Sequence, residues 1–247
     1  RRQRQMCIRD RPDVVVLQEI KAQEATFPRL EIEAAGYRAE IVGQKGFNGV
    51  ALLSLHPVEI TARALPGDDG DEQARYIEGR IATREGPLTV GGLYLPNGNP
   101  IGTEKFAYKL AWMRRLERRA RDLLAREEMF VLGGDYNVCP TDRDVYDPKA
   151  FANDALCQPQ SRAALRALLN LGLTDAVRAF EPEATCYTFW DYQAGAWAKD
   201  WGLRIDHLLL SPQAADRLAA VGIDKPERGR PDPSDHVPVW CELDLAA

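Results

Sequence analysis

The sequence has little of what several common kinds of site require. Its 247 residues include only three histidines and five cysteines, and the cysteines are scattered without a C-x-x-C pair. These counts argue against a histidine-built metal site, a zinc knuckle and a disulfide framework. No apolar run approaches the roughly 20 residues of a membrane span, and no secretory signal is visible at the start. We therefore expect a monomeric, cytoplasmic protein that has no membrane partner.

A strong charge of one sign is also absent. The net charge is -5, with 28% charged and 45% hydrophobic residues, which is typical of a globular domain. Attraction to a polyanion would therefore need a local basic patch or a bound cation. Because no low-complexity linker or fixed repeat divides the chain, we expect a single domain over residues 1–247. The opening stretch 1–11, RRQRQMCIRDR, lacks apolar periodicity and is expected to be non-native or disordered.

Apolar runs with Pro, Gly or Asp at their boundaries recur along the chain, as strands do. They predict strands over residues 13–19, 49–55, 75–83, 87–96, 129–137, 203–211 and 237–245. Helical spacing predicts helices over 27–37, 103–126 and 161–173, with Thr103 as an N-cap and Gly172 as a C-terminal stop. Since several strands follow one another without a helix between them, we expect an α/β fold of two sheets packed face to face with helices outside.

The run FVLGGDYNVCP, residues 130–140, ends on an acid and an amide. Side chains two apart on a strand share a face, so Asp135 and Asn137 should project together where the strand meets its loop. A plain turn would use the same residue types. Other strand ends repeat the pattern, with Glu19, with Tyr94 and Asn97, with Asp206, and with Asp235 and His236.

Each of these side chains also has a structural alternative: Glu19 could cap a helix, Asp206 could pair with Arg204 or another cation, and His236 could be a hydrogen-bonded loop residue. Their joint occurrence favours a site. Two carboxylates about 4 Å apart repel by roughly 4 kcal/mol at an effective dielectric of about 20, so converging acids require a cation. Oxygen donors without thiolates suit Mg²⁺ or Mn²⁺, and Mg²⁺ takes only one or two protein carboxylates. The remaining acids are then free for acid–base work.

The chain resembles the exonuclease III branch of the endonuclease/exonuclease/phosphatase superfamily. The matching motifs, in the family's order, are PDVVVLQEIK, GYRAEIVGQKGFNGVALLS, GLYLPNG, GGDYNVCPTDRDV, TFWDY, GLRIDHLLLS and PSDHVPVW, from Pro12 to about Leu245. The resemblance implies a four-layer αββα sandwich of two mixed β-sheets flanked by helices, with the active site at one end. The family opens with a strand that carries an Asn or Asp, and none precedes RPDVVVLQE, so that first strand is expected to be missing.

Members of this family are Mg²⁺-dependent nucleases of base-excision repair, which cut duplex DNA at abasic sites and remove nucleotides from 3′ ends. The resemblance implies that Glu19 is the main metal ligand and that Asp235 lies near the metal. Asp135 would position or deprotonate the attacking water, or protonate the leaving group, while Asn137 orients the phosphate. These two residues are further candidate metal ligands.

The remaining polar residues receive roles from the same resemblance. His236 would face the scissile phosphate, and Asp206 would orient His236 or act as an acid or base. Tyr94 would contact the phosphate or the leaving oxygen, with Asn97 supporting it. These donors suit an anionic phosphodiester, whose hydrolysis needs positive charge and hydrogen-bond donors near the developing oxyanion.

An aromatic cluster precedes the strand that carries Asp206. Phe189, Trp190, Trp201 and Leu203 match the region where the family builds a pocket for an extruded sugar without its base, although an ordinary core role is the alternative. The basic residues of 103–126 could form a DNA patch. Because acids are interleaved with them, a solvated outer face is favoured.

Two rival functions remain. DNase I-like nucleases, phosphoinositide phosphatases and sphingomyelinases of the superfamily place a second histidine where this chain has Tyr94, which argues against another phosphodiesterase of that kind. A non-catalytic nucleic-acid-binding member would have lost carboxylates that are present here. We therefore expect a Mg²⁺-dependent abasic-site endonuclease and 3′–5′ exonuclease.

Overall fold

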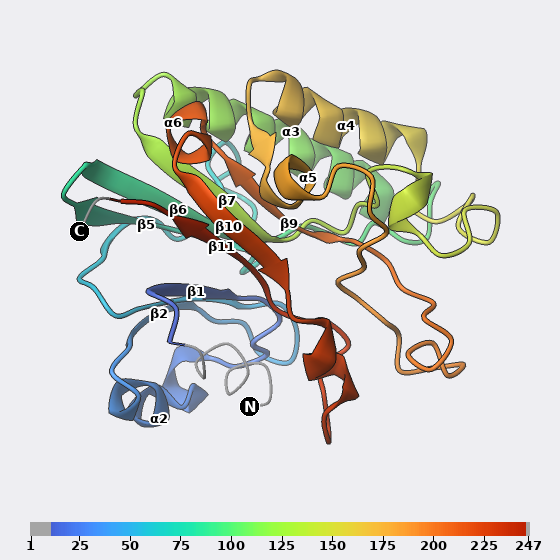
Figure 1. Cartoon of the computed structure of the whole chain (residues 1–247), viewed down its shortest axis with the longest axis horizontal. Helices are drawn as coiled ribbons and strands as arrows, with labels where there is room; N and C mark the ends of the chain where they lie inside the picture. The colour runs from blue at the N-terminus through green and yellow to red at the C-terminus, as the bar shows by residue number, and fades with distance from the viewer. Residues whose placement is uncertain (1–10, 246–247) are drawn as a thin grey trace.

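The structure is a computed structural model that describes residues 11–245. The segment 1–11 was expected to be non-native or disordered. All of it except residue 11 lies outside the described residues. The elements form four layers, in the order helices, sheet, sheet and helix (Figure 1). This arrangement confirms the α/β fold expected from the sequence.

The larger layer is a six-stranded sheet. Its strand order is β4-β5-β6-β7-β9-β8, with β4 (Glu59–Ala62), β5 (Tyr76–Thr83), β6 (Gly86–Tyr94), β7 (Met129–Asp135), β9 (Asp206–Leu210) and β8 (Thr174–Asp175). β6 and β7 are parallel and are joined through the long helix α3 (Glu104–Leu124), and all other pairs are antiparallel. The sheet is therefore mixed.

The second sheet layer holds antiparallel strands in the order β1-β3-β2, with β1 (Val14–Leu17), β3 (Val50–Ser54) and β2 (Arg38–Val42). An antiparallel ribbon of β10 (Leu218–Ile223) and β11 (Val239–Leu243) packs against the same inter-sheet core. Within residues 11–245, β1 pairs only with β3 and β11 pairs only with β10.

Helices cover both outer faces of the sandwich (Figure 1). Helices α3 and α4 (Pro159–Asn170) lie over the six-stranded sheet, α2 (Arg29–Ala34) lies outside the three-stranded sheet, and α5 (Ala176–Phe180) and α6 (Pro212–Ala215) are short. The 3₁₀ turns are η1 (Glu24–Thr26), η2 (Asp142–Asp144) and η3 (Lys225–Gly229). Gly172 follows α4 with a φ of 106°, as its predicted role requires. Thr103 is the N-cap residue of α3, but its hydroxyl donates to the carbonyl of Pro100 (2.7 Å) and caps no helix N–H.

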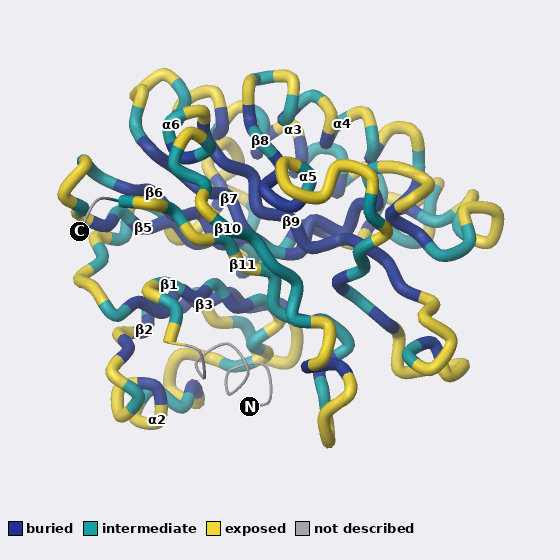
Figure 2. The backbone as a smooth tube through the Cα atoms, viewed as in Figure 1, coloured by how far each residue is buried: buried dark blue, intermediate teal, exposed yellow. Residues whose placement is uncertain are grey.

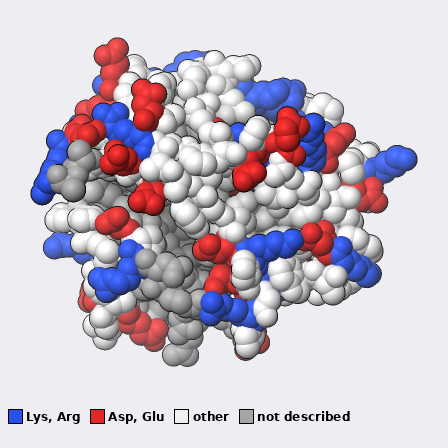
Figure 3. Space-filling view, in the orientation of Figure 1, with Lys and Arg blue, Asp and Glu red and all other residues white. Residues whose placement is uncertain are grey.

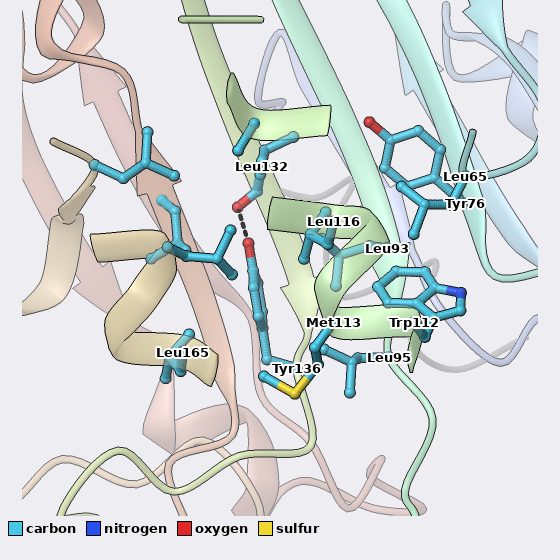
Figure 4. Packing of buried hydrophobic residues seen from close by; sticks show 14 of the residues in the cluster. Leu65, Tyr76, Leu93, Leu95, Trp112, Met113, Leu116, Leu132, Tyr136 and Leu165 are labelled. Carbon is cyan, nitrogen blue, oxygen red and sulfur yellow. Dashed lines mark hydrogen bonds between the residues drawn. The ribbon is translucent and has the colours of Figure 1, made fainter. Parts of the chain in front are cut away.

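Alternation along β7 separates two cores. Phe130 and Leu132 face α3 and α4, whereas Val131 faces the other sheet layer. Figure 4 shows the helix-side cluster, in which the Tyr136 hydroxyl donates to the carbonyl of Leu132 (2.9 Å) beside side chains of α3. The central strands are buried and the helices expose their outer faces (Figure 2). No helix of residues 11–245 is long and apolar enough to span a bilayer.

Candidate active site

Three neighbouring strands carry a polar residue at the same level of the six-stranded sheet. Tyr94 at the end of β6 pairs in register with Asp135 at the end of β7, and Asp135 pairs with Asp206 at the start of β9. Side chains paired in this way project from the same face of a sheet. That face is the inner one, because Val131, four residues before Asp135, and Leu208, two residues after Asp206, pack in the inter-sheet core. The row of polar groups thus lies at one end of this core.

His236 extends the row beyond Asp206. Its Nδ1 lies 2.9 and 3.1 Å from the two carboxylate oxygens of Asp206, and the ring of Phe189 meets the imidazole edge-on at 4.9 Å. Burial alone would lower the pKa of His236, but Asp206, followed by Asp135 and Asp235, raises it to about 10. The side chain is therefore an imidazolium at neutral pH. Because Nδ1 is bound to Asp206, Nε2 is the atom left to donate to an anion.

Asp135 occupies the centre of the row and is buried. Its carboxylate accepts hydrogen bonds from the backbone N–H of Asn137 (2.8 Å) and from the Asn137 amide (3.1 Å). Burial raises the pKa of Asp135, His236 opposes that rise and Asp206 adds to it, so that the pKa is about 7. A carboxyl group that titrates near neutrality can take up and release a proton during a reaction.

Asn137 and Asn97 are joined directly. The amide nitrogen of Asn97 donates to the amide oxygen of Asn137 (3.1 Å), and the Asn137 amide nitrogen also donates to the carbonyl of Leu95 (2.9 Å). The backbone of Asn137 has a φ of 48°, which turns the chain sharply after β7. Hydrogen bonds therefore fix both ends of this amide.

Glu19 closes the other end of the row. It accepts a hydrogen bond from the Tyr94 hydroxyl and pairs with the Lys21 ammonium (2.8 Å). Burial tends to raise the pKa of Glu19, but the hydrogen bonds from Lys21 and Tyr94 outweigh it and lower the pKa. Burial and the contact with Glu19 raise the pKa of Tyr94 far above its usual value, so its hydroxyl remains a neutral donor. The Arg75 guanidinium lies 4.8 Å from the centre of the Tyr94 ring.

The Lys21 ammonium shows that this end of the site favours a cation. The pKa of Lys21 is raised mainly by the hydrogen bond to Glu19, and also by the negative charge of Asp235. No group of three or more His, Cys, Asp or Glu side chains within residues 11–245 is arranged to hold a metal ion. An ion bound by Glu19 and Asp235 would therefore take its other ligands from water and phosphate, as Mg²⁺ commonly does. The two carboxylates fit such an ion.

The two other predicted metal ligands lie in a hydrogen-bonded network. The Asp135 oxygens accept from Asn137, and the Asn137 amide oxygen accepts from Asn97. Asp135 and Asn137 are thus hydrogen-bonded to one another, and Asn137 to Asn97. Their roles as ligands stay predictions.

The predicted aromatic residues fall into two groups. Phe189 contacts His236, and its backbone pairs with that of Leu203 through two hydrogen bonds (2.9 and 3.0 Å). Trp201 is 38% exposed and stacks on Tyr146 at 5.3 Å, with the Lys199 ammonium 4.0 Å from the ring centre. The side chains of Phe189 and Trp201 both keep exposed surface, and Phe189 adjoins the row through His236.

Trp190 is placed differently. Its side chain is fully buried, and its indole N–H donates to the carboxylate of Asp200 (2.9 Å). It also packs edge-on against Trp197 at 5.1 Å. In this conformation the ring supports the loop 190–202 from inside and offers no surface to a ligand, contrary to the expected substrate contact.

Four basic residues of α3, Lys105, Arg114, Arg118 and Arg121, are exposed, as the favoured solvated face predicts, but three others are not. Lys109, Arg115 and Arg119 point inward, since helical spacing places them near the buried Trp112 and Leu116. The Lys109 ammonium donates to the backbone carbonyls of Asn97 and Asn137. The sequence did not lead us to expect this contact. A lysine spaced three and four residues from buried apolar positions was the available signal.

The four-layer fold, with a row of acid, imidazolium, hydroxyl and amide groups at one end of its inter-sheet core, defines the class of this protein. The chain belongs to the Endonuclease/Exonuclease/phosphatase family, whose profile matches residues 2–236. It is 35% identical over 240 residues to exodeoxyribonuclease III of Haemophilus influenzae, covering 94% of this chain and 90% of that protein.

Solved structures give the same result. An AP endonuclease from Archaeoglobus fulgidus matches with a TM-score of 0.89 and 33% identity, over 96% of this chain and 90% of that one. The 3′ phosphatase NExo from Neisseria, bound to a product DNA hairpin, matches with a TM-score of 0.92 and 35% identity, over 98% and 92% of the two chains.

Proposed function

We propose that this chain is a Mg²⁺-dependent DNA repair nuclease that incises duplex DNA at abasic sites and removes nucleotides from 3′ ends. The observation that supports it best is the contact between the Asp206 carboxylate and the His236 imidazolium, next to an Asp135 carboxyl whose pKa is about 7. The His236 imidazolium can donate a hydrogen bond to a phosphate, and the nearby Asp135 carboxylate can take a proton from water. Relatives named exodeoxyribonuclease III and AP endonuclease point to the same reaction.

In the proposed reaction, a water oxygen attacks the phosphorus and the bond between phosphorus and the 3′ oxygen breaks. Asp135 accepts the proton of the water, and the Nε2–H of His236 donates to a phosphate oxygen as negative charge develops. The Tyr94 hydroxyl donates to the phosphate or to the departing 3′ oxygen, which takes up a proton from solvent water as it leaves, while Asp135 returns its own proton to solvent. Asn137, held by Asn97, orients the phosphate.

Glu19 and Asp235 would hold the metal, for which Mn²⁺ is a substitute. When bound, Mg²⁺ supplies positive charge that stabilises the transition state of phosphoryl transfer. On the face drawn in Figure 3, basic and acidic side chains of the described residues are interspersed. With a net charge of -5, attraction to DNA would then depend on local groups and on the cation.

Phe189 and Trp201 would form the wall that receives an extruded sugar, whereas Leu203, contrary to the expected contact, is buried in the core behind it. Apolar side chains admit a deoxyribose without its base and exclude a larger nucleotide. Trp190 would support this wall from behind. A monomeric, cytoplasmic protein acting as one domain belongs to the same proposal.

Incision of a duplex oligonucleotide that carries one tetrahydrofuran abasic analogue tests the proposal. We expect cutting 5′ of the analogue with Mg²⁺, none with EDTA, and loss of cutting in His236→Ala. A second duplex with a recessed 3′ end measures release of nucleotides. Tight binding of DNA without cutting would favour the non-catalytic alternative, and hydrolysis of other phosphoesters alone would favour another phosphodiesterase of the family.

A further inference from the structure

We infer that Lys109 is a positioning residue of this site: its buried amine ties the turn after β6 to the turn after β7 and so sets the spacing of Asn97 and Asn137. The inference concerns the site of the proposed nuclease and rests on that proposal for its effect on catalysis. Its effect on the two turns does not depend on the reaction.

The contacts of Lys109 are unusual for a lysine. Its side chain is 0% exposed, and Nζ donates to the backbone carbonyls of Asn97 (3.0 Å) and Asn137 (2.5 Å). No ion pair to Nζ is present among residues 11–245. A buried ammonium without a paired carboxylate depends on its hydrogen bonds for stabilisation. The carbonyl of the buried Asn137 would lose this partner if the amine were removed, and an unpaired buried acceptor is costly.

These two carbonyls belong to Asn97 and Asn137, whose side chains are proposed to orient the phosphate. The Asn97 amide donates to the Asn137 amide, which in turn donates to the Asp135 carboxylate (3.1 Å for each bond). The distance between the two turns therefore controls where the Asn137 amide and, through it, the Asp135 carboxylate lie. Lys109 fixes that distance from the helix side of the sheet, opposite the face on which the row projects.

The turn after β6 is shaped around the lysine stem. Gly98 has a φ of 89°, and a Cβ placed on it would lie 2.6 Å from Cδ and 3.2 Å from Cβ of Lys109. One helical turn further on, Trp112 and Met113 are buried in the core beneath the sheet. The amine is thus held on a rigid helix and fits closely under the turn, which is how a supporting residue can define a site to a fraction of an ångström.

The charge of Lys109 also acts on the centre of the row. Burial lowers the pKa of Lys109 to about 8, with Asp135 and Asp154 opposing that effect. Lys109 in turn is one of the groups that lower the pKa of Asp135. The lysine and the central carboxylate therefore stabilise each other's charged forms.

Steady-state incision of the abasic duplex by Lys109→Met, with Leu123→Ala as a matched control, tests the effect on catalysis. Leu123 is buried on α3 near the start of β7, so its truncation loosens the same helix at the far end of the strand. For Lys109→Met we expect kcat to fall about 10²-fold, as displaced catalytic groups cause, with KM changed little. For Leu123→Ala we expect kcat within about threefold of wild type at a temperature where both are folded. Lys109→Gln keeps a hydrogen-bond donor, so its kcat should lie between those of the other two variants. It replaces Lys109→Met in the experiment if that variant does not fold.

Hydrogen exchange on the free protein tests the positioning itself. The backbone amides of Leu95, Tyr136 and Asn137 donate to Asp135 and Ile205 in and beside the two turns. They should exchange faster in Lys109→Met than in wild type and Leu123→Ala. Unchanged exchange in a folded Lys109→Met, or a kcat within about threefold of wild type, would overturn the inference. If the wild type cuts no DNA, the proposed function fails while the exchange comparison still decides the role of Lys109.

Discussion

Asp206→Asn removes the charge that holds His236 protonated. The structure raises the pKa of His236 from the ordinary 6.5 to about 10, a difference of about 3.5 units. At about 1.4 kcal/mol per unit this corresponds to roughly 5 kcal/mol in favour of the imidazolium. Asp206 is the foremost of the groups that raise the pKa, and an amide in its place keeps a hydrogen-bond acceptor but no charge. Since burial then dominates, we expect the pKa of His236 in the variant to be 6.5 or lower.

At pH 7.5 the protonated fraction of His236 would then fall from nearly one in the wild type to about a tenth or less in the variant. Long-range ¹H–¹⁵N spectra in metal-free buffer measure this directly, because only three histidines contribute. Incision at the same pH should slow by about 10²–10⁴-fold, the usual contribution of a group that acts on protons in the transition state. A histidine pKa that is raised on folding stabilises the native state fully below pH 6.5 and loses that effect as the pH rises through about 10. The difference in unfolding free energy between wild type and variant should shrink over the same window.

The chain contains a matched control in the exposed pair of His56 and Asp13, whose atoms lie 2.8 Å apart. Asp13→Asn makes the same chemical change on the surface and should leave incision within about twofold, since exposed pairs contribute little. If His236 in Asp206→Asn were still an imidazolium at pH 7.5, the electrostatic reasoning would be refuted. A variant that cuts DNA at nearly the wild-type rate would refute the role of the pair.

Three further predictions concern the rest of the row. The acid limb of the pH–rate profile of kcat/KM should lie near the Asp135 pKa of about 7, with activity rising as the carboxylate forms; Asp135→Asn should abolish that limb and slow incision by about 10²–10⁴-fold. Glu19→Gln should raise the Mg²⁺ concentration for half-maximal rate by about tenfold or more, as measured by metal titration, while the melting temperature in EDTA changes little. Gly134→Ala should destabilise the fold by more than about 3 kcal/mol in urea unfolding, because its Cβ would lie 2.0 Å from the carbonyl oxygen of Leu93; a soluble variant of wild-type stability would contradict the backbone geometry of β7.

Most of the predicted strands are present: β1 and β11 lie within their predicted ranges, as do strands buried between two layers. β3, β5, β6 and β7 lie within or close to their predicted ranges, because continuous apolar runs with glycine at their ends leave few alternatives. β9 begins at Asp206 and not at 203, since the Thr188 hydroxyl accepts the N–H groups of Ile205 and Asp206. That capping contact joins distant segments and has no local signal. β2, β4 and β10 were missed because their half-exposed sequences, such as RAEIV and EITA, resemble loops.

The residues of the site were recognisable as a set, but their geometry was not. Polar side chains at strand ends identified the row, whereas the register that sets Tyr94, Asp135 and Asp206 side by side depends on strand pairing over more than a hundred residues. Of the partners considered for Asp206, Arg204 or another cation, the structure gives another cation, His236. Arg204 is buried and binds Asp144 (2.6 Å) and Asp175 (2.8 Å), which leaves Asp206 to His236. Arg204 lies two residues before Asp206, and side chains two apart on a strand share a face. The alternation of side chains along the strand therefore could not exclude Arg204 as the partner of Asp206.

The basic residues of α3 show why sequence patterns underestimate groups that act through the backbone. A run of lysine and arginine with interleaved acids has the composition of a solvated face, yet Arg119 binds the buried Glu78, and Arg115 binds Asp71 and loop carbonyls. Within residues 11–245 Lys109 binds carbonyls alone, and a carbonyl carries no residue-specific signal in a sequence. Its importance can be read only when the turns after β6 and β7 are seen to meet over one amine. The helix thus does more than cover the sheet, because through Lys109 it holds together the two strand ends on which the site is built.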